Sequence, residues 1–389
     1  MMRILSVLIA LLMLTSSLFA QGNAEYRKKV VWGKEKTILT TDFKEVKKPS
    51  INDFIKIFHF DPIRQDTTGT CWAFSGVSFV ESEIARLGYG QVKLSEMYIA
   101  YREYVEKARR FVREKGDSEF GEGSEQNAVL LRMKQYGCVP AESYSGLVNG
   151  LLKHNHEAMF QEMNDYLTFI KNNEYWDETV VLSTIRQILN KYIGEPPAEF
   201  VYKGENYTPI TFMQKVVKIN PDDYVDFMST LKFPFYTLGE YEVPDNWWHC
   251  QNYYNIPLDE FYNGIKNAVR NGYTIAIGGD VSEAGKSGED DIAIVVPWDL
   301  SQKDINQNSR EYRFYNKTST DDHGIHLVGY TSKFGHDWFL IKDSGSSAYN
   351  GDNKGYYFFR DDFIKLKMLS FMVHRDAVKG ILAKMSKTK

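Results

Sequence analysis

The segment QDTTGTCWAF (residues 65–74) carries the strongest structural and chemical signal in this 389-residue chain. From Cys71 onward, apolar residues recur at helical spacing as far as Leu87, and Gly88 then supplies a C-terminal stop. The sequence therefore predicts a helix over residues 71–87 with Cys71 at its start. A thiol is a strong nucleophile only as the thiolate, which a helix N-terminus and a nearby histidine favour. Cys71 is thus a candidate nucleophile.

Gln65 stands six residues before Cys71, across a loop rich in Gly and Thr. From there its side-chain amide can donate to the oxyanion of a tetrahedral intermediate, together with the backbone N–H of Cys71. Preset donors of this kind each stabilise a transition state by a few kcal/mol. Taken singly, Cys71 reads as a buried structural thiol and Gln65 as a surface amide, so the indication comes from their combination.

Helical and strand-like patterns occupy different parts of the chain. Further helices are predicted over residues 95–115, 125–136, 157–171, 178–192 and 257–270. Strands are predicted over residues 273–277, 292–296, 323–330, 338–343 and 355–359. Helices first and strands later indicate an α+β fold with its site between two halves. The segment VSEAGKSGEDD (281–291) is predicted to be a loop whose acidic run is solvated.

The string Gln, five residues, Cys-Trp-Ala-Phe resembles the nucleophile signature of papain-like cysteine peptidases. In that family a histidine begins one strand, and an asparagine follows on the next in a string like IKNSWG. His323 and Asp343 fall on those positions, so the resemblance implies His323 as the base and Asp343 as the residue that orients it. His326 is the nearest rival, but the two-residue period of a strand turns it away from His323, to pack or to meet solvent.

Two residues near the predicted base depart from the family pattern. Asp343 replaces the usual asparagine, and a carboxylate should hold the imidazole and favour imidazolium more strongly, which shifts the pH optimum. Gly345 stands where the family has a tryptophan that shields this contact, and Trp338 or Trp72 is a candidate replacement. These departures leave open a catalytically silent peptide-binding protein.

Other segments resemble the bleomycin hydrolase and aminopeptidase C branch of that family. They are LSEMYIAY (94–101), GEGSEQNAVLLRMKQYGCVP (121–140), TPITFMQKVVKINPDDYVDF (208–227) and NIPLDEFYNGIKNAVRNGYTIAIGGDV (255–281). Gly123 falls on a glycine that lines the branch's substrate cleft, and Ser124 on a second one. With Trp72 they form the predicted substrate-binding set. Thr68 replaces a disulfide cysteine of extracellular papains, in keeping with a branch that does not depend on disulfides.

The resemblance covers residues 50–378 and implies a papain-like fold. Its predicted parts are a helical half with the nucleophile (60–140), a large mostly helical insertion (141–255) and an antiparallel β-barrel half with the histidine (256–389). It implies a cysteine aminopeptidase that acts on peptides through a Cys-His-Asp triad and a thioester acyl-enzyme. It also implies a homo-hexameric ring, and no metal or other cofactor.

Other activities remain open. In the branch the extreme C-terminus blocks the cleft, whereas KGILAKMSKTK (379–389) is shorter and more basic than the family tail. An open cleft would permit endopeptidase action. A transglutaminase-like acyltransferase would use the same triad, but it is not expected to carry a glutamine six residues before its cysteine.

The N-terminus has the pattern of a secretory signal. One basic residue, Arg3, precedes an apolar run from Ile4 to Leu14, and the small residues Ser16, Ser17 and Ala20 follow. We predict a signal peptide over residues 1–20, export to the periplasm or the exterior, and no stable membrane insertion after its removal; the alternative is an uncleaved anchor. A formal net charge of -4 gives no indication of a nucleic-acid partner.

The chain has three cysteines, which excludes a disulfide framework. If Cys71 is catalytic, Cys138 and Cys250 either pair or stay apart. Cys138, in the segment YGCVP, is predicted to be a small core residue.

Overall fold

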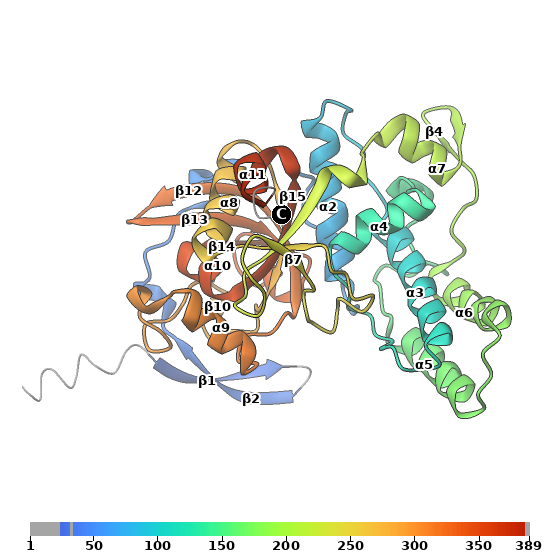
Figure 1. Cartoon of the computed structure of the whole chain (residues 1–389), viewed down its shortest axis with the longest axis horizontal. Coiled ribbons are helices and arrows are strands. Elements are labelled where there is room, and N and C mark those ends of the chain that lie inside the picture. Colours follow the sequence, from blue (N-terminus) through green and yellow to red (C-terminus); the bar gives the residue numbers. More distant parts are fainter. Residues whose placement is uncertain (1–23, 32–33, 386–389) are drawn as a thin grey trace, which may run out of the picture.

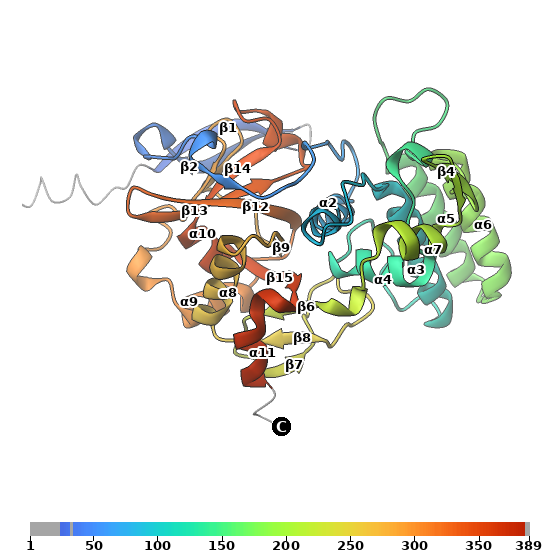
Figure 2. The same ribbon diagram turned by 90° about the horizontal axis from the view of Figure 1, so that it is seen from above.

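The computed structural model describes residues 24–31 and 34–385, which form a helix-rich half and a strand-rich half (Figure 1). Helix α2 (Cys71–Arg86) lies between the two halves in the views of Figures 1 and 2. The predicted α+β class is confirmed, and the candidate nucleophile lies at the junction. The predicted signal peptide lies outside the described residues. Over the part of the chain that the structure covers, every helix is too short or too polar to cross a bilayer.

Helix α2 is buried because both halves pack on it. Its apolar residues Val77, Val80 and Ile84 are fully buried. The strand half contacts it through β9 and β12, and the helical half through α3 and α4. It ends where predicted, with Leu87 as its C-cap and Gly88 next in a left-handed conformation at φ 79°. A helix covered on most sides is a rigid support for a side chain at its first position.

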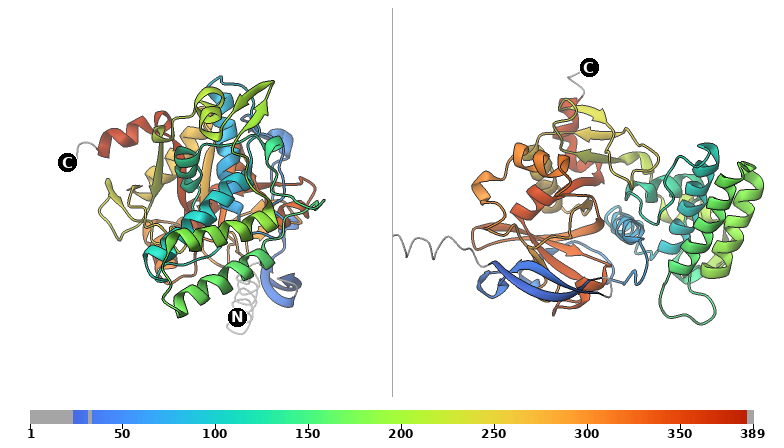
Figure 3. Two further views of the ribbon diagram at one scale, coloured as in Figure 1. Left: turned by 90° about the vertical axis from the view of Figure 1, so that its right-hand side faces the viewer. Right: turned by 90° about the horizontal axis from the view of Figure 1, so that it is seen from below.

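The helical half contains α3 (Glu96–Arg113), α4 (Asn127–Tyr136), α5 (Glu157–Asn172) and α6 (Glu178–Ile193). These helices lie close to the predicted ranges. Ser95 caps α3 and Asp177 caps α6, in each case through a side-chain oxygen that accepts a backbone N–H of the first turn. Helices α5 and α6 lie side by side at the outer edge of this half (Figure 3).

The strand half is one sheet, in the order β10-β11-β14-β13-β12-β9-β15-β6-β8-β7, with β3 beside β12. Most neighbouring strands are antiparallel; β11 with β14 and β6 with β8 are parallel. Its strands are β3 (Ile55–Lys56), β6 (Tyr224–Met228), β7 (Thr237–Gly239), β8 (Tyr253–Asn255), β9 (Ile275–Gly279), β10 (Lys286–Ser287), β11 (Ile292–Ala293), β12 (His323–Lys333), β13 (His336–Lys342), β14 (Tyr356–Arg360) and β15 (Met368–His374).

Several elements were not predicted from the sequence. They are the hairpin β1 (Ala24–Val31) and β2 (Lys34–Thr41), the short pair β4 (Phe200–Tyr202) and β5 (Glu205–Tyr207), and helices α7 (Pro209–Phe212), α9 (Gln307–Tyr315), α10 (Asp361–Lys367) and α11 (Lys379–Met385). Helix α8 (Leu258–Arg270) matches its prediction. Strands β6, β7 and β8 lie within the predicted insertion, 141–255, yet they pair into the sheet of the strand half. The insertion is therefore helical only in its first part.

The prediction that the acidic run of residues 289–291 is solvated holds for Glu289, which is exposed, and is wrong for Asp291. Asp291 is buried rather than solvated, and its carboxylate accepts hydrogen bonds from the backbone and side-chain nitrogens of Asn353 at 3.0 and 2.7 Å. Cys138 is buried in the helical core, as predicted, and Cys138 and Cys250 are not paired.

Candidate active site

Cys71 and His323 meet where α2 touches the strand half. His323 is the first residue of β12, where it pairs with Gly279 at the end of β9. Its imidazole is in hydrogen-bonding contact with the Cys71 thiol. The thiol is partly exposed, whereas most of α2 is buried. Two side chains that are far apart in the sequence therefore form a thiol–imidazole pair that a substrate can reach.

Asp343 fixes the orientation of the imidazole. It directly follows β13, and its Oδ1 lies 2.8 Å from Nε2 of His323. The same oxygen accepts the backbone N–H of Gly345 at 2.7 Å. Because Nε2 faces the carboxylate, Nδ1 is the ring nitrogen left for Cys71. The arrangement is that of a nucleophile, a base and an orienting group.

The charges of this pair support each other. Burial lowers the pKa of His323, but the negative charge of Asp343 and the contact with Cys71 outweigh it and raise the pKa well above its usual value. Burial raises the pKa of Asp343, but His323, Lys286 and the Gly345 N–H together hold it well below its ordinary range. A carboxylate next to an imidazolium is therefore the favoured state.

Lys286 and Gly345 pack around the carboxylate of Asp343, near Oδ2 and Oδ1 respectively. The Nζ of Lys286 lies 3.8 Å from Oδ2 of Asp343 and 4.4 Å from the ring centroid of Tyr357. A Cβ added to Gly345 would lie 3.1 Å from Oδ1 of Asp343 and 3.5 Å from Nε2 of His323. The backbone of Gly345 thus packs directly against the His323–Asp343 contact.

The two tryptophans proposed to shield that contact are engaged elsewhere. The indole N–H of Trp338 donates to the Lys333 carbonyl at the other end of β12. That of Trp72 donates to the Glu122 carbonyl in the helical half. Neither indole N–H is directed at Asp343, so the shielding comes from the glycine backbone and from Lys286.

Gln65 links the loop before α2 to the strand half. Its Oε1 accepts the Ser344 hydroxyl at 2.7 Å, its backbone N–H donates to the Ser344 carbonyl at 3.0 Å, and its Nε2 donates to the Thr68 carbonyl at 2.6 Å. An amide nitrogen carries two hydrogens, so one N–H of Gln65 remains for another acceptor. The backbone N–H of Cys71, the first in its helix, has no intrahelical acceptor. Gln65 thus lies in the loop that leads to α2, and Cys71 at its start; their joint role as oxyanion donors stays a prediction.

Comparisons with known proteins agree with this arrangement. The sequence model of the Peptidase C1-like family matches residues 121–388, a range that includes His323 and Asp343 and begins after Cys71. This chain belongs to the Peptidase C1-like family. No curated protein matches it.

One solved structure supports the papain-like fold of this family member. The crystal structure of PepW from Lactobacillus rhamnosis HN001 is similar over 86% of this chain and 84% of PepW, with a TM-score of 0.63 and 19% identity. Two other structures, both 13% identical, score lower. One comes from a study of the mite allergens Blo t 1 and Der p 1 and matches 85% of this chain and 73% of that chain, with a TM-score of 0.40. The other is digestive procathepsin L 3 of Tenebrio molitor larval midgut, which matches 91% of this chain and 77% of that chain, with a TM-score of 0.35.

The predicted substrate-binding residues of this Peptidase C1-like chain lie in or beside the loop at residues 121–126, but their side chains face inward. Trp72 is 1% exposed, and Ser124 is 5% exposed and donates to Glu103 at 2.6 Å. Gly123 is partly exposed, and an added Cβ there would lie 2.3 Å from Oδ1 of Asp245. Contact of this loop with a substrate stays a prediction, and it would have to use the loop backbone.

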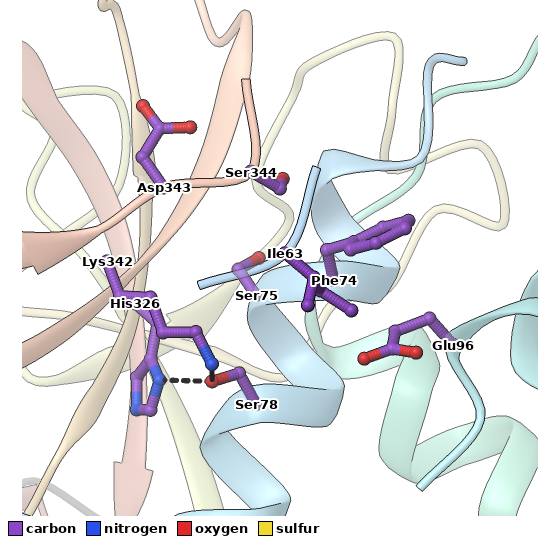
Figure 4. A pocket seen from close by; sticks show the side chains of 9 residues that line it. All are labelled: Ile63, Phe74, Ser75, Ser78, Glu96, His326, Lys342, Asp343 and Ser344. Atoms are coloured by element: carbon purple, nitrogen blue, oxygen red, sulfur yellow. Dashed lines mark hydrogen bonds between the residues drawn. The ribbon is translucent and has the colours of Figure 1, made fainter. Parts of the chain in front are cut away.

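His326 is not a second candidate base. It is fully buried, and its Nδ1 lies 2.9 Å from the Ser78 hydroxyl, which also accepts a hydrogen bond from Lys342 at 2.8 Å (Figure 4). Burial, Lys342 and His59 lower the pKa of His326 well below its ordinary value, so the ring is neutral. Of the two outcomes predicted for His326, packing is the one observed.

Lys286 is the residue near the site that the sequence did not identify. It lies in the segment predicted to be a loop, and it reaches Asp343 because β10 and β11 pair beside β14. The replacement of asparagine by Asp343 adds a charge and so signals the need for a cation. The sequence has 47 Lys and Arg residues and gives no means of choosing among them.

Proposed function

We propose that this chain is a cysteine aminopeptidase that hydrolyses peptides from the N-terminus. The observation that carries the proposal is the convergence of the Cys71 thiol, the His323 imidazole and the Asp343 carboxylate at the junction of the two halves. Membership of the Peptidase C1-like family supports peptide hydrolysis. The preference for the N-terminus rests on the resemblance of the segments around residues 94–140 and 208–281 to the aminopeptidase C branch.

The proposed reaction has two stages. Cys71 passes its proton to Nδ1 of His323, and its sulfur attacks the scissile carbonyl carbon. The resulting oxyanion accepts hydrogen bonds from the Cys71 N–H and the Gln65 amide. When the C–N bond breaks, His323 protonates the departing amine and a thioester remains on Cys71. His323 then takes a proton from water, the hydroxide attacks the thioester, and the acid product leaves as the thiol is restored.

One observation favours an endopeptidase as the second candidate. The described part of the C-terminal segment, α11, packs on α8: Ile381 lies against Gly264, and Lys384 pairs with Glu260 at 2.8 Å. This part of the segment is therefore held on the strand half by contacts of its own. A cleft left open at that end would accept peptides on both sides of the scissile bond.

Substrate tests separate these functions. Single-residue fluorogenic amides with a free amine and N-blocked peptides are compared, with and without an epoxide that traps cysteine. Cleavage of free-amine substrates alone supports the aminopeptidase, and cleavage of blocked peptides supports the endopeptidase. Peptide binding without turnover supports a silent binding protein. Cys71→Ala should abolish turnover and leave folding intact, and activity that survives in this variant contradicts the assignment.

Two further parts of the proposal concern the mature protein. Export with removal of residues 1–20 is tested by N-terminal sequencing of the protein recovered outside the cytoplasm. A ring of six copies is tested by light scattering. A mature chain that starts at Met1 contradicts cleavage of the signal. The mass of a single chain in solution, which is 45.0 kDa before cleavage, contradicts the ring.

A further inference from the structure

A pair of acidic side chains lies next to the candidate site. Glu125 belongs to the loop before α4, and Asp321 precedes His323 by two residues. Their carboxyl groups are in hydrogen-bonding contact. One comes from the helical half and the other from the strand half, so the pair spans the same junction that brings Cys71 and His323 together.

The loop that carries Glu125 is fixed against both walls of the site. The side-chain Nε2 of the next residue, Gln126, donates to the Ile277 carbonyl on β9 at 3.1 Å and to the Ile325 carbonyl on β12 at 3.0 Å. The same nitrogen donates to the Ser75 hydroxyl on α2 at 3.0 Å. These contacts hold Glu125 in place relative to the nucleophile and the base.

The acidic pair lacks a cation. Glu125 is 4% exposed, and its Oε1 has no hydrogen-bond partner. Tyr241, which is 3% exposed, has its hydroxyl in hydrogen-bonding contact with Asp321. Within residues 24–31 and 34–385, neither carboxylate has an ion pair with Lys, Arg or His. Buried groups of this kind are costly unless they find a partner.

The two carboxyl groups reduce that cost by sharing a proton. Burial raises the pKa of Asp321 to about 7, and the charge of nearby Asp245 adds to the effect. Burial and the charge of Asp321 raise the pKa of Glu125 well above its ordinary value. Because both pKa values are raised, the pair keeps part of its protons near neutral pH and carries no more than about one negative charge, which suits a ligand with one positive charge.

A cavity of about 720 Å³ reaches Asp321 of this pair and is also lined by Tyr241. Phe233, Phe314 and Leu369 give it apolar walls. Three cations also line the cavity: Arg310, Lys232 and Lys317. The guanidinium of Arg310 donates to three backbone carbonyls, those of Ser229, Lys365 and Leu369, and Lys232 pairs with Glu242. A cavity of this size can hold a small organic group.

We infer that Glu125 and Asp321 form a binding site for a primary ammonium group of the peptide substrate. The inference rests on the proposed function and specifies the substrate class of the same site. The ammonium group has two sources, the N-terminal amine of the peptide and a lysine side chain. If the N-terminal amine binds there, the first residue of the peptide lies next to Cys71. Glu125 and Asp321, at the junction of the two halves, would then restrict cleavage to the N-terminus.

The test uses the full chain and three fluorogenic amides: one of alanine with a free amine, one of acetyl-Ala-Ala and one of acetyl-Lys-Ala. The variants are Glu125→Gln, Asp321→Asn and the two combined. Each single variant keeps one carboxylate and should change KM less than about tenfold. The double variant has no carboxylate at the pair. The matched control is Glu240→Gln, which lies on the wall of the same cavity and pairs with His249 instead.

In the double variant, KM should rise roughly 10- to 100-fold for the substrates that carry the ammonium group, the range for the loss of a charged hydrogen bond. For acetyl-Ala-Ala amide, KM should stay within about threefold of the parent value; a blocked amide that is not turned over is instead measured by its Ki against the substrate that is cleaved, and the same threefold limit applies. A rise for the alanine amide alone identifies the N-terminal amine, and a rise for acetyl-Lys-Ala alone identifies the lysine side chain. An equal change for all three substrates, or no change for any, overturns the inference. Thermal unfolding confirms that the double variant is folded.

A binding measurement separates this inference from the proposed function. Titration of Cys71→Ala protein with trialanine, in calorimetry, is repeated with the two acids also replaced. If the chain with Cys71 intact turns over no substrate but trialanine binding depends on the acids, the proposed function fails and the inference stands. If turnover depends on Cys71 but neither KM nor trialanine binding responds to the acids, the inference fails and the function stands.

Discussion

Replacing Asp343 with Asn removes one negative charge from the site and keeps the shape of the side chain. The oxygen that faces Nε2 of His323 at 2.8 Å then belongs to a neutral amide. Two unit charges about 4 Å apart interact by roughly 4 kcal/mol at an effective dielectric constant of about 20. Measured shifts next to an opposite charge are about 1–3 pKa units, and we take this smaller range for the fall in the pKa of His323.

The sign of the change in the pH profile follows from the role of the imidazolium. The imidazolium of His323 loses its proton as pH rises through the raised pKa of this residue. In Asp343→Asn that pKa is lower, so the alkaline limb of kcat/KM should move down by about 1–3 pH units. The assay is the pH dependence of hydrolysis of a fluorogenic substrate, with Cys71→Ala as the blank. An alkaline limb that stays in place would refute the claim that Asp343 sets the charge state of His323.

Lys286 provides a second arm of the same experiment. Its Nζ is 3.8 Å from the buried Oδ2 of Asp343, and Lys286→Met leaves that carboxylate without this cation. Breaking a buried pair costs about 3–5 kcal/mol. Adding Asp343→Asn should recover part of this loss, whereas the exposed control Lys303→Met should change the free energy of unfolding by less than about 0.5 kcal/mol. Additive effects of the two substitutions in urea unfolding would show that the residues do not interact.

Three further outcomes are expected. Gln65→Ala should lower kcat about 10²–10³-fold with little change in KM, because it removes an oxyanion donor, and stopped assays over a substrate series check this. Gly345→Ala places a methyl group 3.1 Å from Oδ1 of Asp343, so we expect kcat to fall without loss of the fold, measured by activity beside circular dichroism. His326→Ala should retain Cys71-dependent turnover and lower the free energy of unfolding by about 1–3 kcal/mol, because the buried Ser78 hydroxyl loses a partner; loss of turnover in a folded His326→Ala protein would contradict its structural role.

Local patterns predicted the helical half well. Helix α2 and its neighbours have clear apolar spacing and recognisable caps, such as Ser95 and Gly88, and these signals act within a few residues. The predicted ranges of α3, α5 and α6 agree with the structure to within two residues at each end. The first position of Cys71 on its helix follows from the same local information.

Strands without alternation were missed. Strand β15, MLSFMVH, is buried at every position, because it lies inside the sheet between β9 and β6. An apolar run of that length has no two-residue period to reveal it. The hairpin of β1 and β2 was missed for a different reason. Its strands carry charged residues such as those of the Lys28–Glu35 pair, and their sequences show no alternation of apolar and polar positions.

The assignment of His323 and Asp343 needed the family resemblance, because periodicity alone does not say which strands meet α2. Lys286, Glu125 and Asp321 could not be placed from the sequence for the same reason. Each lies far along the chain from the group it acts on, and only strand order or the packing of the two halves brings them together.

Two aspartates, one before and one after His323 in the sequence, have different environments and therefore suit different roles. Asp343 is buried beside a histidine and a lysine, and its pKa is held well below the ordinary range. Asp321 is partly buried beside another carboxyl group, and its pKa is raised to about 7. Environments that move the pKa values of like groups in opposite directions typically mark groups with different roles. Asp343, which already has its cations, is suited to orient the imidazole, whereas Asp321 and Glu125 have none and are suited to receive one from a substrate.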